Sequence, residues 1–248
     1  MDLLEQEKIR SSQFKRHPWE IVRLKILLFL LKKRPDKNLI VDVGSGDAFV
    51  ATQLSEKLFN TKIAAVDINY NEQFINDNKR TNIVFLKNIS HVPEIGIIDT
   101  ILLMDVLEHI ERPEDLLDDI RTLKNVSSAT EFIITVPAFQ FLFSEHDTFL
   151  KHYRRYNRIE LNGLVCKEGF KIKSSGYFFV TLFFARLCQK LFGIKPSQGL
   201  HNWNRGRLMT SIIIALLWTD FKICWYLSRI GINLPGLSCY CICHPLPS

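Results

Sequence analysis

The stretch VDVGSGDAFVATQL, Val41 to Leu54, joins a short apolar run to a glycine turn and then to a helical pattern. Gly44 allows the chain to turn sharply after a buried strand, and Gly46 allows the backbone to approach a ligand closely. In a doubly wound α/β sheet, such a turn lies at the carboxyl ends of the strands, where ligands bind. The stretch therefore predicts a binding loop after the first strand of such a sheet.

The side chains around this loop indicate which ligand it holds. Phe49 stands where a dinucleotide-binding turn requires a third small residue, and the carboxylate of Asp47 at the helix start repels a pyrophosphate. Asp67 ends the next predicted strand, where its carboxylate can accept hydrogen bonds from both ribose hydroxyls. We therefore expect an adenosine ligand without a pyrophosphate, and S-adenosylmethionine, whose sulfonium is positively charged, is such a ligand.

Apolar runs alternate with helical patterns over residues 38–137, an order typical of a parallel sheet with helices on both faces. Two further apolar runs occur late in the chain. The sequence thus predicts a Rossmann-like α/β fold, with a doubly wound, mostly parallel seven-stranded sheet, helices on both faces and a helical insertion before the last strand. The strands expected after the first are KIAAVDIN, TNIVFLKN, IIDTILLMD, TEFIITVP, GFKIKSSGY and GLSCYCICH, and the helices expected between them include residues 47–57 and 112–123.

No repeat or low-complexity linker divides the chain, so we expect a single domain of residues 1–248. Its expected parts are an N-terminal helical lid (1–37), a cofactor-binding core (38–136), an active-site segment (137–157), an apolar and basic helical insertion (177–230) and the last strand (237–244). His17, Trp19 and Arg23 fall on the first helix. This helix either closes over the cofactor pocket, with Trp19 as an apolar plug, or simply packs on the sheet.

Charge is unevenly distributed along the chain. Residues 38–150 hold eighteen Asp and Glu against eight Lys and Arg, whereas residues 151–248 hold fourteen Lys and Arg against three Asp and Glu. The acidic middle suits a cationic ligand and the basic, aromatic end suits an anionic partner such as a lipid surface, although three solvated faces of one soluble protein give the same totals. Nucleic acid is not expected as a partner, because the basic residues lie among bulky aliphatic side chains.

Two segments of the insertion, Tyr177 to Ile194 and Leu208 to Leu227, are mainly apolar, and each is interrupted by two charged residues. These charges argue against a bilayer span, which takes about 20 apolar residues. The segments either pack as core or dimer-interface helices or lie in the plane of an anionic membrane. Because no secretory signal opens the chain, we expect a cytoplasmic protein that is able to associate with the membrane.

The cysteines are expected as reduced thiols, because no export signal accompanies them. Cys239, Cys241 and Cys243 alternate along one predicted strand, so they point to the same face of it and lack the spacing of a chelating pair. We therefore expect a buried strand at this place and no metal site in the protein.

Four motifs, VDVGSGDA, AVDIN, LKNI and LLMDVLEHIERPEDLL, resemble those of the class I S-adenosylmethionine-dependent methyltransferases. The resemblance covers about residues 38–135 and implies a methyltransferase with S-adenosylmethionine as its cofactor. Asn88 stands where this family often has Asp near the adenine amine, and its side-chain oxygen can still accept that bond. The implied cofactor contacts are Asp42, Gly44, Ser45 and Gly46 at the methionine part, Asp67 and Ile68 at the ribose, Asn88 and Ile89 at the adenine, and Met104 and Asp105 closing the pocket.

Three segments outside this core, HPWEIVRLKIL, SEHDTFLKHYRRY and GLSCYCICHP, resemble a branch of small methyltransferases found near sugar and lipid assembly. This resemblance implies a small-molecule acceptor that is sugar-, lipid- or isoprenoid-linked. The segment SEHDTFLKHYRRY follows the fifth predicted strand, so it should lie over the carboxyl ends of the sheet and face the cofactor. The residues expected to act on or bind the acceptor are His146, Asp147, His152, Arg154, Arg155, Tyr156 and His109.

Within this segment we expect either His146 or His152 to be the base, because a histidine beside carboxylates can act near neutral pH. Arg154 and Arg155 are expected to bind a phosphate or carboxylate of the acceptor. Alternatively, the segment pairs internally, with its arginines on nearby acids, and Glu108 and His109 only brace their loop. Two other functions stay open at this point, a non-catalytic Rossmann-fold scaffold at the membrane and an NAD-dependent oxidoreductase. The sequence leaves the acceptor atom and the oligomeric state open.

Overall fold

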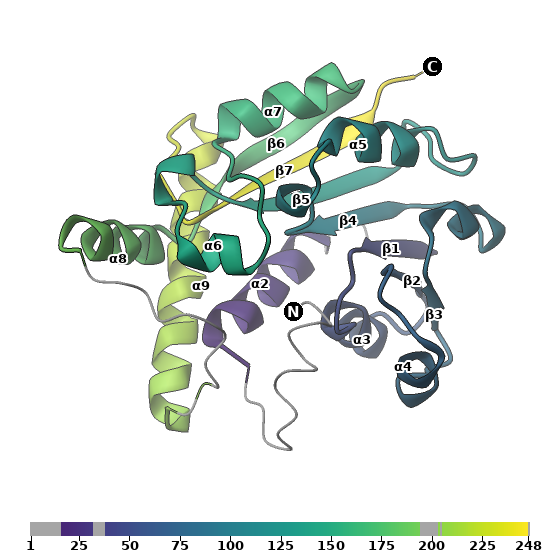
Figure 1. Ribbon diagram of the computed structural model, residues 1–248, viewed down its shortest axis with the longest axis horizontal. Coiled ribbons are helices and arrows are strands. Elements are labelled where there is room, and N and C mark those ends of the chain that lie inside the picture. The colour runs from purple at the N-terminus through teal and green to yellow at the C-terminus, as the bar shows by residue number, and fades with distance from the viewer. Residues whose placement is uncertain (1–15, 32–37, 194–202, 204, 248) are drawn as a thin grey trace.

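The central sheet has seven strands in the order β3-β2-β1-β4-β5-β7-β6 (Figure 1). The computed structural model describes residues 16–31, 38–193, 203 and 205–247. Strands β1 to β5 pair in parallel, whereas β7 runs antiparallel to both β5 and β6. The strands are β1 (Leu39–Val43), β2 (Lys62–Val66), β3 (Ile83–Leu86), β4 (Thr100–Met104), β5 (Glu131–Pro137), β6 (Phe170–Phe178) and β7 (Ser238–Pro245).

The parallel register gathers the loops that carry the predicted cofactor residues at one edge of the sheet. In β1, Val43 lies opposite Val66 of β2 and Leu103 of β4, so these strands end at nearly the same level. All five residues of β1 are buried, as expected for a central parallel strand that is covered on both faces. The turns after β1, β2 and β4 therefore lie side by side.

Helices cover both faces of the sheet, and each face has its own buried apolar cluster. One face is covered by α5 (Pro113–Arg121) and α7 (Arg158–Lys167), which bury residues such as Leu117 and Leu161. The other face is covered by α2 (Pro18–Leu31), α3 (Phe49–Lys57) and α9 (Arg207–Arg229) (Figure 1). The predicted fold class, with helices on both faces of a mostly parallel sheet, is confirmed.

The helical insertion before the last strand is also confirmed. It consists of α8 (Val180–Leu191) and α9, and most of the segment between them lies outside the described residues. Asp220 of α9 is buried, and its carboxylate accepts hydrogen bonds from the backbone N–H groups of Val180 and Thr181 at 3.1 and 2.8 Å. The charge that interrupts the second apolar segment therefore fixes the start of α8.

Strand β7 is buried, as its sequence predicts. Cys239, Cys241 and Cys243 all belong to the cluster under α5 and α7, whereas Tyr240 and Ile242 belong to the opposite cluster. The alternation therefore divides the strand between the two faces of the sheet. Burial raises the pKa of the Cys239 thiol above its usual range, so this thiol stays protonated at neutral pH.

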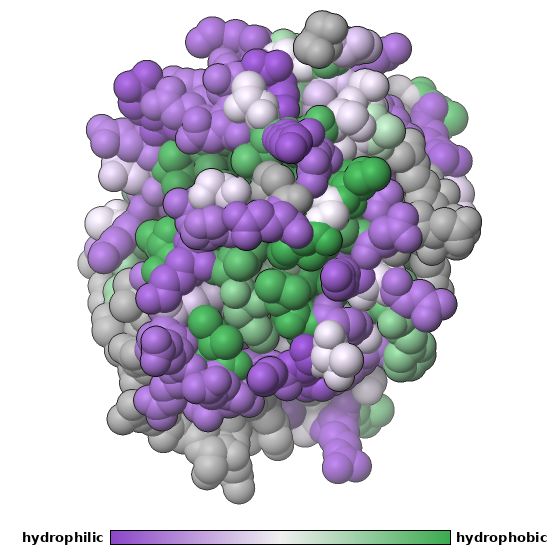
Figure 2. All heavy atoms as spheres, turned by 90° about the vertical axis from the view of Figure 1, so that its right-hand side faces the viewer, coloured by the Kyte–Doolittle hydropathy of each residue, from purple (hydrophilic) through white to green (hydrophobic). Residues whose placement is uncertain are grey.

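The two edge strands of the sheet are β6 and β3. Strand β3 is flanked in sequence by the short helices α4 (Glu72–Asp77) and η1 (Ile89–Glu94). Figure 2 shows the molecule from the side at which this edge lies in Figure 1. Hydrophobic side chains gather in the middle of this face, and hydrophilic side chains surround them. Only Ile83 is buried in β3, as expected for an edge strand.

Candidate active site

The loop after β1 takes the shape that the glycines predict. Gly44 and Gly46 have φ angles of 67° and 52°. A Cβ atom on Gly44 would lie 2.7 Å from Cγ2 of Val106, so only glycine fits between this loop and the loop after β4. The backbone N–H of Ser45 donates to the carbonyl oxygen of Val66 at 3.1 Å, which ties the loop to the end of β2.

Asp67 holds this loop from the end of β2. Its Oδ2 accepts a hydrogen bond from the N–H of Gly46 at 2.8 Å, and its Oδ1 accepts one from the N–H of Asn69 at 2.9 Å. Each carboxylate oxygen has further acceptor capacity, so both remain able to accept ribose hydroxyls. The neighbouring Ile68 is 83% exposed and lies at the surface beside this carboxylate.

Three buried polar atoms under the loop have no hydrogen-bond partner within the described part of the chain. They are Oδ2 of Asp42, Oγ of Ser45 and the hydroxyl of Tyr70. Burial raises the pKa of Asp42 to about 7; the nearby Ser45 hydroxyl opposes this rise, whereas the charges of Asp47 and Asp67 add to it. A polar, positively charged ligand would supply the missing partners and the missing charge. These residues therefore fit the methionine part of S-adenosylmethionine.

Asp47 is paired within the protein, contrary to the expectation of a bare carboxylate at the helix start. Its Oδ1 accepts the N–H of Phe49 at 3.2 Å, and its carboxylate forms an ion pair with Arg16, whose guanidinium also lies 3.7 Å from the centre of the Phe49 ring. The charge that was expected to repel a pyrophosphate is thus compensated by Arg16. The expectation that Asp47 repels a pyrophosphate is therefore corrected. The sequence did not indicate this pairing, because the two residues lie 31 positions apart.

Two of the expected adenine and pocket contacts are engaged within the protein. Oδ1 of Asn88 accepts the N–H of Ser90 at 2.9 Å and caps η1, so its role at the adenine stays a prediction. Asp105 follows β4 with a φ angle of 56° and forms an ion pair with Arg23 at 2.6 Å. Met104 and Ile89 are partly buried beside the apolar clusters, so both retain exposed surface.

Helix α2 combines features of both expected arrangements. Its body packs into the core through residues such as Val22 and Ile26. Arg16, just before it, pairs with Asp47 beside the glycine loop, and Arg23, in its second turn, pairs with Asp105, one of the expected cofactor contacts. The lid expected over residues 1–37 stays a prediction, and residues 1–15 and 32–37 lie outside the described chain.

The active-site segment is organised around Asp147, whose side chain is fully buried. Oδ1 accepts hydrogen bonds from Nδ1 of His152 at 3.0 Å and Nε of Arg155 at 2.7 Å. Oδ2 accepts from the N–H of Ser144 at 2.9 Å and Nη2 of Arg155 at 3.0 Å. These bonds hold the pKa of Asp147 well below its usual range despite its burial. Asp147 is therefore engaged within the protein, and its part in catalysis stays a prediction.

Two expected acceptor contacts are used inside the protein instead. All three guanidinium nitrogens of Arg155 are engaged, two with Asp147 and Nη1 with the carbonyl oxygen of Ala138 at 3.3 Å. Tyr156 is buried, and its hydroxyl donates to the carbonyl oxygen of Leu107 at 3.3 Å. For these two residues, the internal pairing of the segment describes the structure better than acceptor binding does.

Arg154 differs from Arg155 because only part of its guanidinium is engaged. Its Nη2 donates to the carbonyl oxygen of Glu111 at 2.6 Å, and its guanidinium carbon lies 5.9 Å from the centre of the Tyr153 ring. The remaining donors of this half-buried side chain are able to meet an anionic acceptor.

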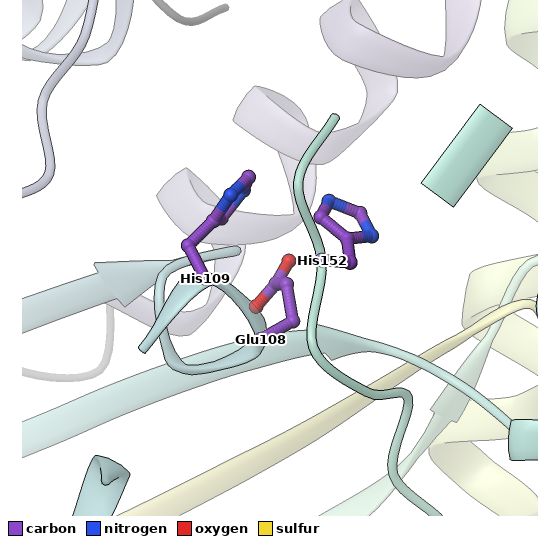
Figure 3. A group of neighbouring side chains, drawn as sticks. All are labelled: Glu108, His109 and His152. Atoms are coloured by element: carbon purple, nitrogen blue, oxygen red, sulfur yellow. The ribbon is translucent and has the colours of Figure 1, made fainter. Parts of the chain in front are cut away.

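Three side chains from two separate parts of the sequence meet beyond the end of β4 (Figure 3). Glu108 and His109 belong to η2 (Leu107–His109), and His152 comes from the active-site segment. The N–H of Tyr153 donates to the carbonyl oxygen of Glu108 at 2.8 Å, which fixes the two segments together. The rings of His109 and His152 lie edge to face with centres 4.5 Å apart.

His146 lies in α6 (Glu145–Phe149), in the same segment. Its Nδ1 is buried and has no hydrogen-bond partner in the parts of the chain that the structure describes. Burial and the positive charge of Arg186 lower its pKa below the usual value of 6.5, so the ring is neutral at pH 7. A neutral imidazole with an unused nitrogen is able to accept a proton.

A family model described as a methyltransferase domain matches residues 16–175. The chain belongs to this family. The expected enzyme class, a methyltransferase, and its cofactor, S-adenosylmethionine, are thereby confirmed over the scaffold and oxidoreductase alternatives. No curated protein sequence matches the chain.

Solved structures share the fold of this methyltransferase. A SAM-dependent methyltransferase from Archaeoglobus fulgidus is 15% identical, with a TM-score of 0.56 over 97% of this chain and 98% of that chain. Phosphoethanolamine N-methyltransferase 2 from Haemonchus contortus, in complex with S-adenosyl-L-methionine, is 14% identical, with a TM-score of 0.53 over 88% of this chain and 52% of that one. The plantazolicin methyltransferase BamL is also 14% identical, with a TM-score of 0.53 over 91% and 85% of the two chains.

The contacts of several charged residues were not predicted from the sequence. Arg16 pairs with Asp47 from just before α2, Arg23 of α2 pairs with Asp105, and Arg186 of α8 lowers the pKa of His146. For Arg186, a charge within an apolar helical segment was the available signal, because such a charge usually has a buried role. Nothing in the local sequence indicates the partners of Arg16 and Arg23.

Replacing the buried carboxyl of Asp42 is expected to stabilise the cofactor-free protein and to weaken cofactor binding. Because the folded pKa is raised to about 7 from 3.8, burial destabilises the cofactor-free protein increasingly as pH rises through that range. We expect Asp42→Asn to raise the Tm of the cofactor-free methyltransferase at pH 8 by at least about 4 °C. The same change should weaken S-adenosylmethionine binding about 10- to 100-fold, because a charged partner is lost. Thermal melting at pH 5 and pH 8, with calorimetry, measures both effects; an unchanged Tm at pH 8 would contradict the assignment.

Proposed function

We propose that the protein transfers a methyl group from S-adenosylmethionine to a hydroxyl of a sugar-, lipid- or isoprenoid-linked acceptor at the cytoplasmic face of a membrane. The observation that carries the proposal is the position of His146. This neutral histidine lies in the segment that follows β5, and the first helix of the apolar insertion, α8, packs against that segment. The base and the apolar surface would therefore meet the same acceptor.

Contacts between α8 and the active-site segment support a common acceptor site. Phe183 of α8 packs on Phe139 with ring centres 5.2 Å apart, and Nζ of Lys190 donates to the carbonyl oxygen of Phe141. The charge of Arg186 also acts on His146. An acceptor with an apolar chain and a polar head would place the chain along α8 and the head near His146. Arg154 and His109 are the remaining candidates for binding that head, particularly if it carries a phosphate.

The base assignment predicts a specific kinetic change. We expect His146→Ala to lower kcat by roughly 10²- to 10⁴-fold with little change in KM for S-adenosylmethionine, because only proton removal is lost. Because the pKa of His146 is lowered, kcat of the unmodified protein should fall only at a pH below the ordinary imidazole pKa of 6.5, and the variant should lack this dependence. A variant that keeps kcat within a few-fold, or keeps the acid limb, would assign the base elsewhere.

Helix α9 carries two apolar faces on opposite sides. Leu217, Phe221 and Trp225 are buried against the sheet. On the other side an exposed apolar stripe follows the helix, with spacings of three, four and seven residues that keep it on one face. The stripe consists of Leu208, Ile212, Leu216, Ile223 and Tyr226, which are 78%, 53%, 52%, 51% and 60% exposed, and it continues in Ile230 just after the helix, which is 71% exposed.

The length and flanks of this stripe favour contact with an anionic membrane. Among the described residues, α9 is the one helix that is long and apolar enough to cross a membrane, judged by length and composition alone. Only 28% of its most apolar 18-residue stretch is buried inside the protein. Arg207 and Arg229 lie at its two ends, where they could meet lipid phosphates. Since Asp220 of this helix is buried at the start of α8, we place α9 in the plane of the membrane rather than across it.

Vesicle binding tests this placement. We expect the protein to sediment with vesicles containing phosphatidylglycerol at low salt and to bind about tenfold less after Ile212→Asp with Leu216→Asp, because each carboxylate opposes insertion. The matched control is Asp118→Asn, an exposed charge change on α5, which should bind as the unmodified protein does. Equal binding of both variants, or no binding by the unmodified protein at any salt concentration, would argue against the membrane surface.

Transfer of a labelled methyl group tests the function as a whole. The protein is incubated with labelled S-adenosylmethionine and total lipid extract, and the label is counted after separation of the organic phase. We expect label in the lipid fraction that disappears with His146→Ala. Label found only in the aqueous fraction would contradict the lipid-linked acceptor.

A further inference from the structure

We propose that Glu108, His109 and His152 form a binding site for a divalent transition-metal ion, such as zinc, next to the acceptor site. One ligand atom from each residue lies within 4.8 Å of those of the other two. In Figure 3, the carboxyl group of Glu108 points toward the space between the two histidine rings. The ion site itself does not depend on the proposed function; only the acceptor site beside it does.

Glu108 is the first independent observation that points to a ligand. Its side chain is fully buried, and neither carboxylate oxygen has a hydrogen-bond partner among the residues that the structure describes. A buried carboxyl without a partner is costly and therefore requires an explanation in a native structure. A bound cation would satisfy both oxygens and compensate the charge.

His152 is the second observation, because its orientation is fixed by a carboxylate. Its Nδ1 lies 3.0 Å from Oδ1 of Asp147, which is itself held by Arg155. Because Nδ1 is engaged with this carboxylate, Nε2 is the ring nitrogen left to bind a metal ion. Metal-binding histidines usually have such a carboxylate on the other ring nitrogen, which sets the tautomer and the ring direction.

The donor set indicates the class of metal. Two imidazole nitrogens and one carboxylate oxygen suit zinc and similar transition metals, whereas magnesium and calcium prefer oxygen ligands alone. Three protein ligands leave a fourth position open, where an oxygen of the acceptor could bind. Ligand distances of about 2.0–2.2 Å require donor atoms roughly 3.4 Å apart, so the three side chains must approach each other slightly as the ion binds.

The site is assembled by the fold rather than by a local motif. Glu108 and His109 follow β4, while His152 is brought beside them by the N–H of Tyr153 on the carbonyl oxygen of Glu108 and by the hydroxyl of Tyr156 on that of Leu107. This explains why no metal-binding spacing is visible in the sequence.

Cobalt binding tests the site without relying on activity. Full-length protein is freed of metal with a chelator and titrated with Co²⁺, which absorbs visible light strongly when it has few ligands, and Zn²⁺ then competes for the site. We expect one ion per chain, a visible spectrum, and an increase in Tm of several degrees at saturation. Glu108→Gln and His152→Ala should each weaken binding at least tenfold, whereas His91→Ala, at an exposed histidine of η1, should bind as the unmodified protein does.

Two results would overturn the proposal. One is a metal-free protein that gives neither the spectrum nor the increase in Tm with Co²⁺ or Zn²⁺. The other is equal affinity in the unmodified protein and in both folded site variants, which would place the ion elsewhere. Failure of this test leaves the methyl-transfer assay unaffected, whereas failure of methyl transfer with cobalt binding intact would overturn the proposed function alone.

Discussion

Replacing Asp147 by alanine is expected to lower the free energy of unfolding by about 3–5 kcal/mol. The reason is that the change removes the charged partner that the described residues give Arg155, whose side chain is 10% exposed, and an uncompensated buried charge is strongly destabilising. It also frees His152 and the N–H of Ser144. Urea denaturation followed by circular dichroism measures the loss, with the midpoint and slope fitted separately.

A matched control for this variant is Asp118→Ala. Asp118 pairs with Arg121 at 2.5 Å on the exposed side of α5, so its removal should cost less than about 1 kcal/mol. Because the folded pKa of Asp147 is depressed, its stabilisation should be present above about pH 4 and be lost as pH falls further. Similar losses for the two variants would contradict the central role of Asp147 in the segment.

Replacing Asp67 by alanine is expected to weaken binding of S-adenosylmethionine and of its demethylated product by roughly 10²- to 10³-fold. Two effects add: the ribose hydroxyls lose a charged acceptor, and the N–H of Gly46 loses its partner at 2.8 Å. Equilibrium dialysis measures the affinity, with Asp77→Ala as the control, because Asp77 is an exposed carboxylate on α4. A dissociation constant within threefold of the unmodified value would remove Asp67 from the cofactor site.

The fold was predictable from the sequence because its signals are local. The turn with Gly44 and Gly46, the acid that ends β2 and the alternation of Cys239, Cys241 and Cys243 each reflect the geometry of one strand and its adjoining loop. The parallel register then places the turns after β1, β2 and β4 together, so most of the cofactor site follows from the fold.

The acceptor site was less predictable because its contacts join distant segments. The sequence places His146, Asp147 and His152 in one segment, but it does not reveal which is buried and which is exposed. The ion pair between Asp147 and Arg155 converts two expected active groups into a structural pair. Likewise, the pairing of Arg16 with Asp47 depends on the direction in which α2 packs across the sheet. The spacing of residues in the sequence does not indicate that direction.

Glu108 was also not predictable as a buried residue, because at a loop start it has the sequence properties of an ordinary surface acid. Its complete burial follows from the return of the chain at Tyr153, whose N–H binds the carbonyl oxygen of Glu108. A contact between such distant segments is visible only once the fold is known.

The central claim is that the pocket after β1 binds an adenosine with a sulfonium and does not bind a dinucleotide, and calorimetric titration tests it most directly. The unmodified protein is titrated at pH 7.5 with S-adenosylmethionine, S-adenosylhomocysteine and NAD. We predict one site per chain for the first two ligands, with affinity reduced in Asp42→Asn and Asp67→Ala, and no measurable heat with NAD. Tight binding of NAD together with no binding of either adenosyl ligand would contradict the account.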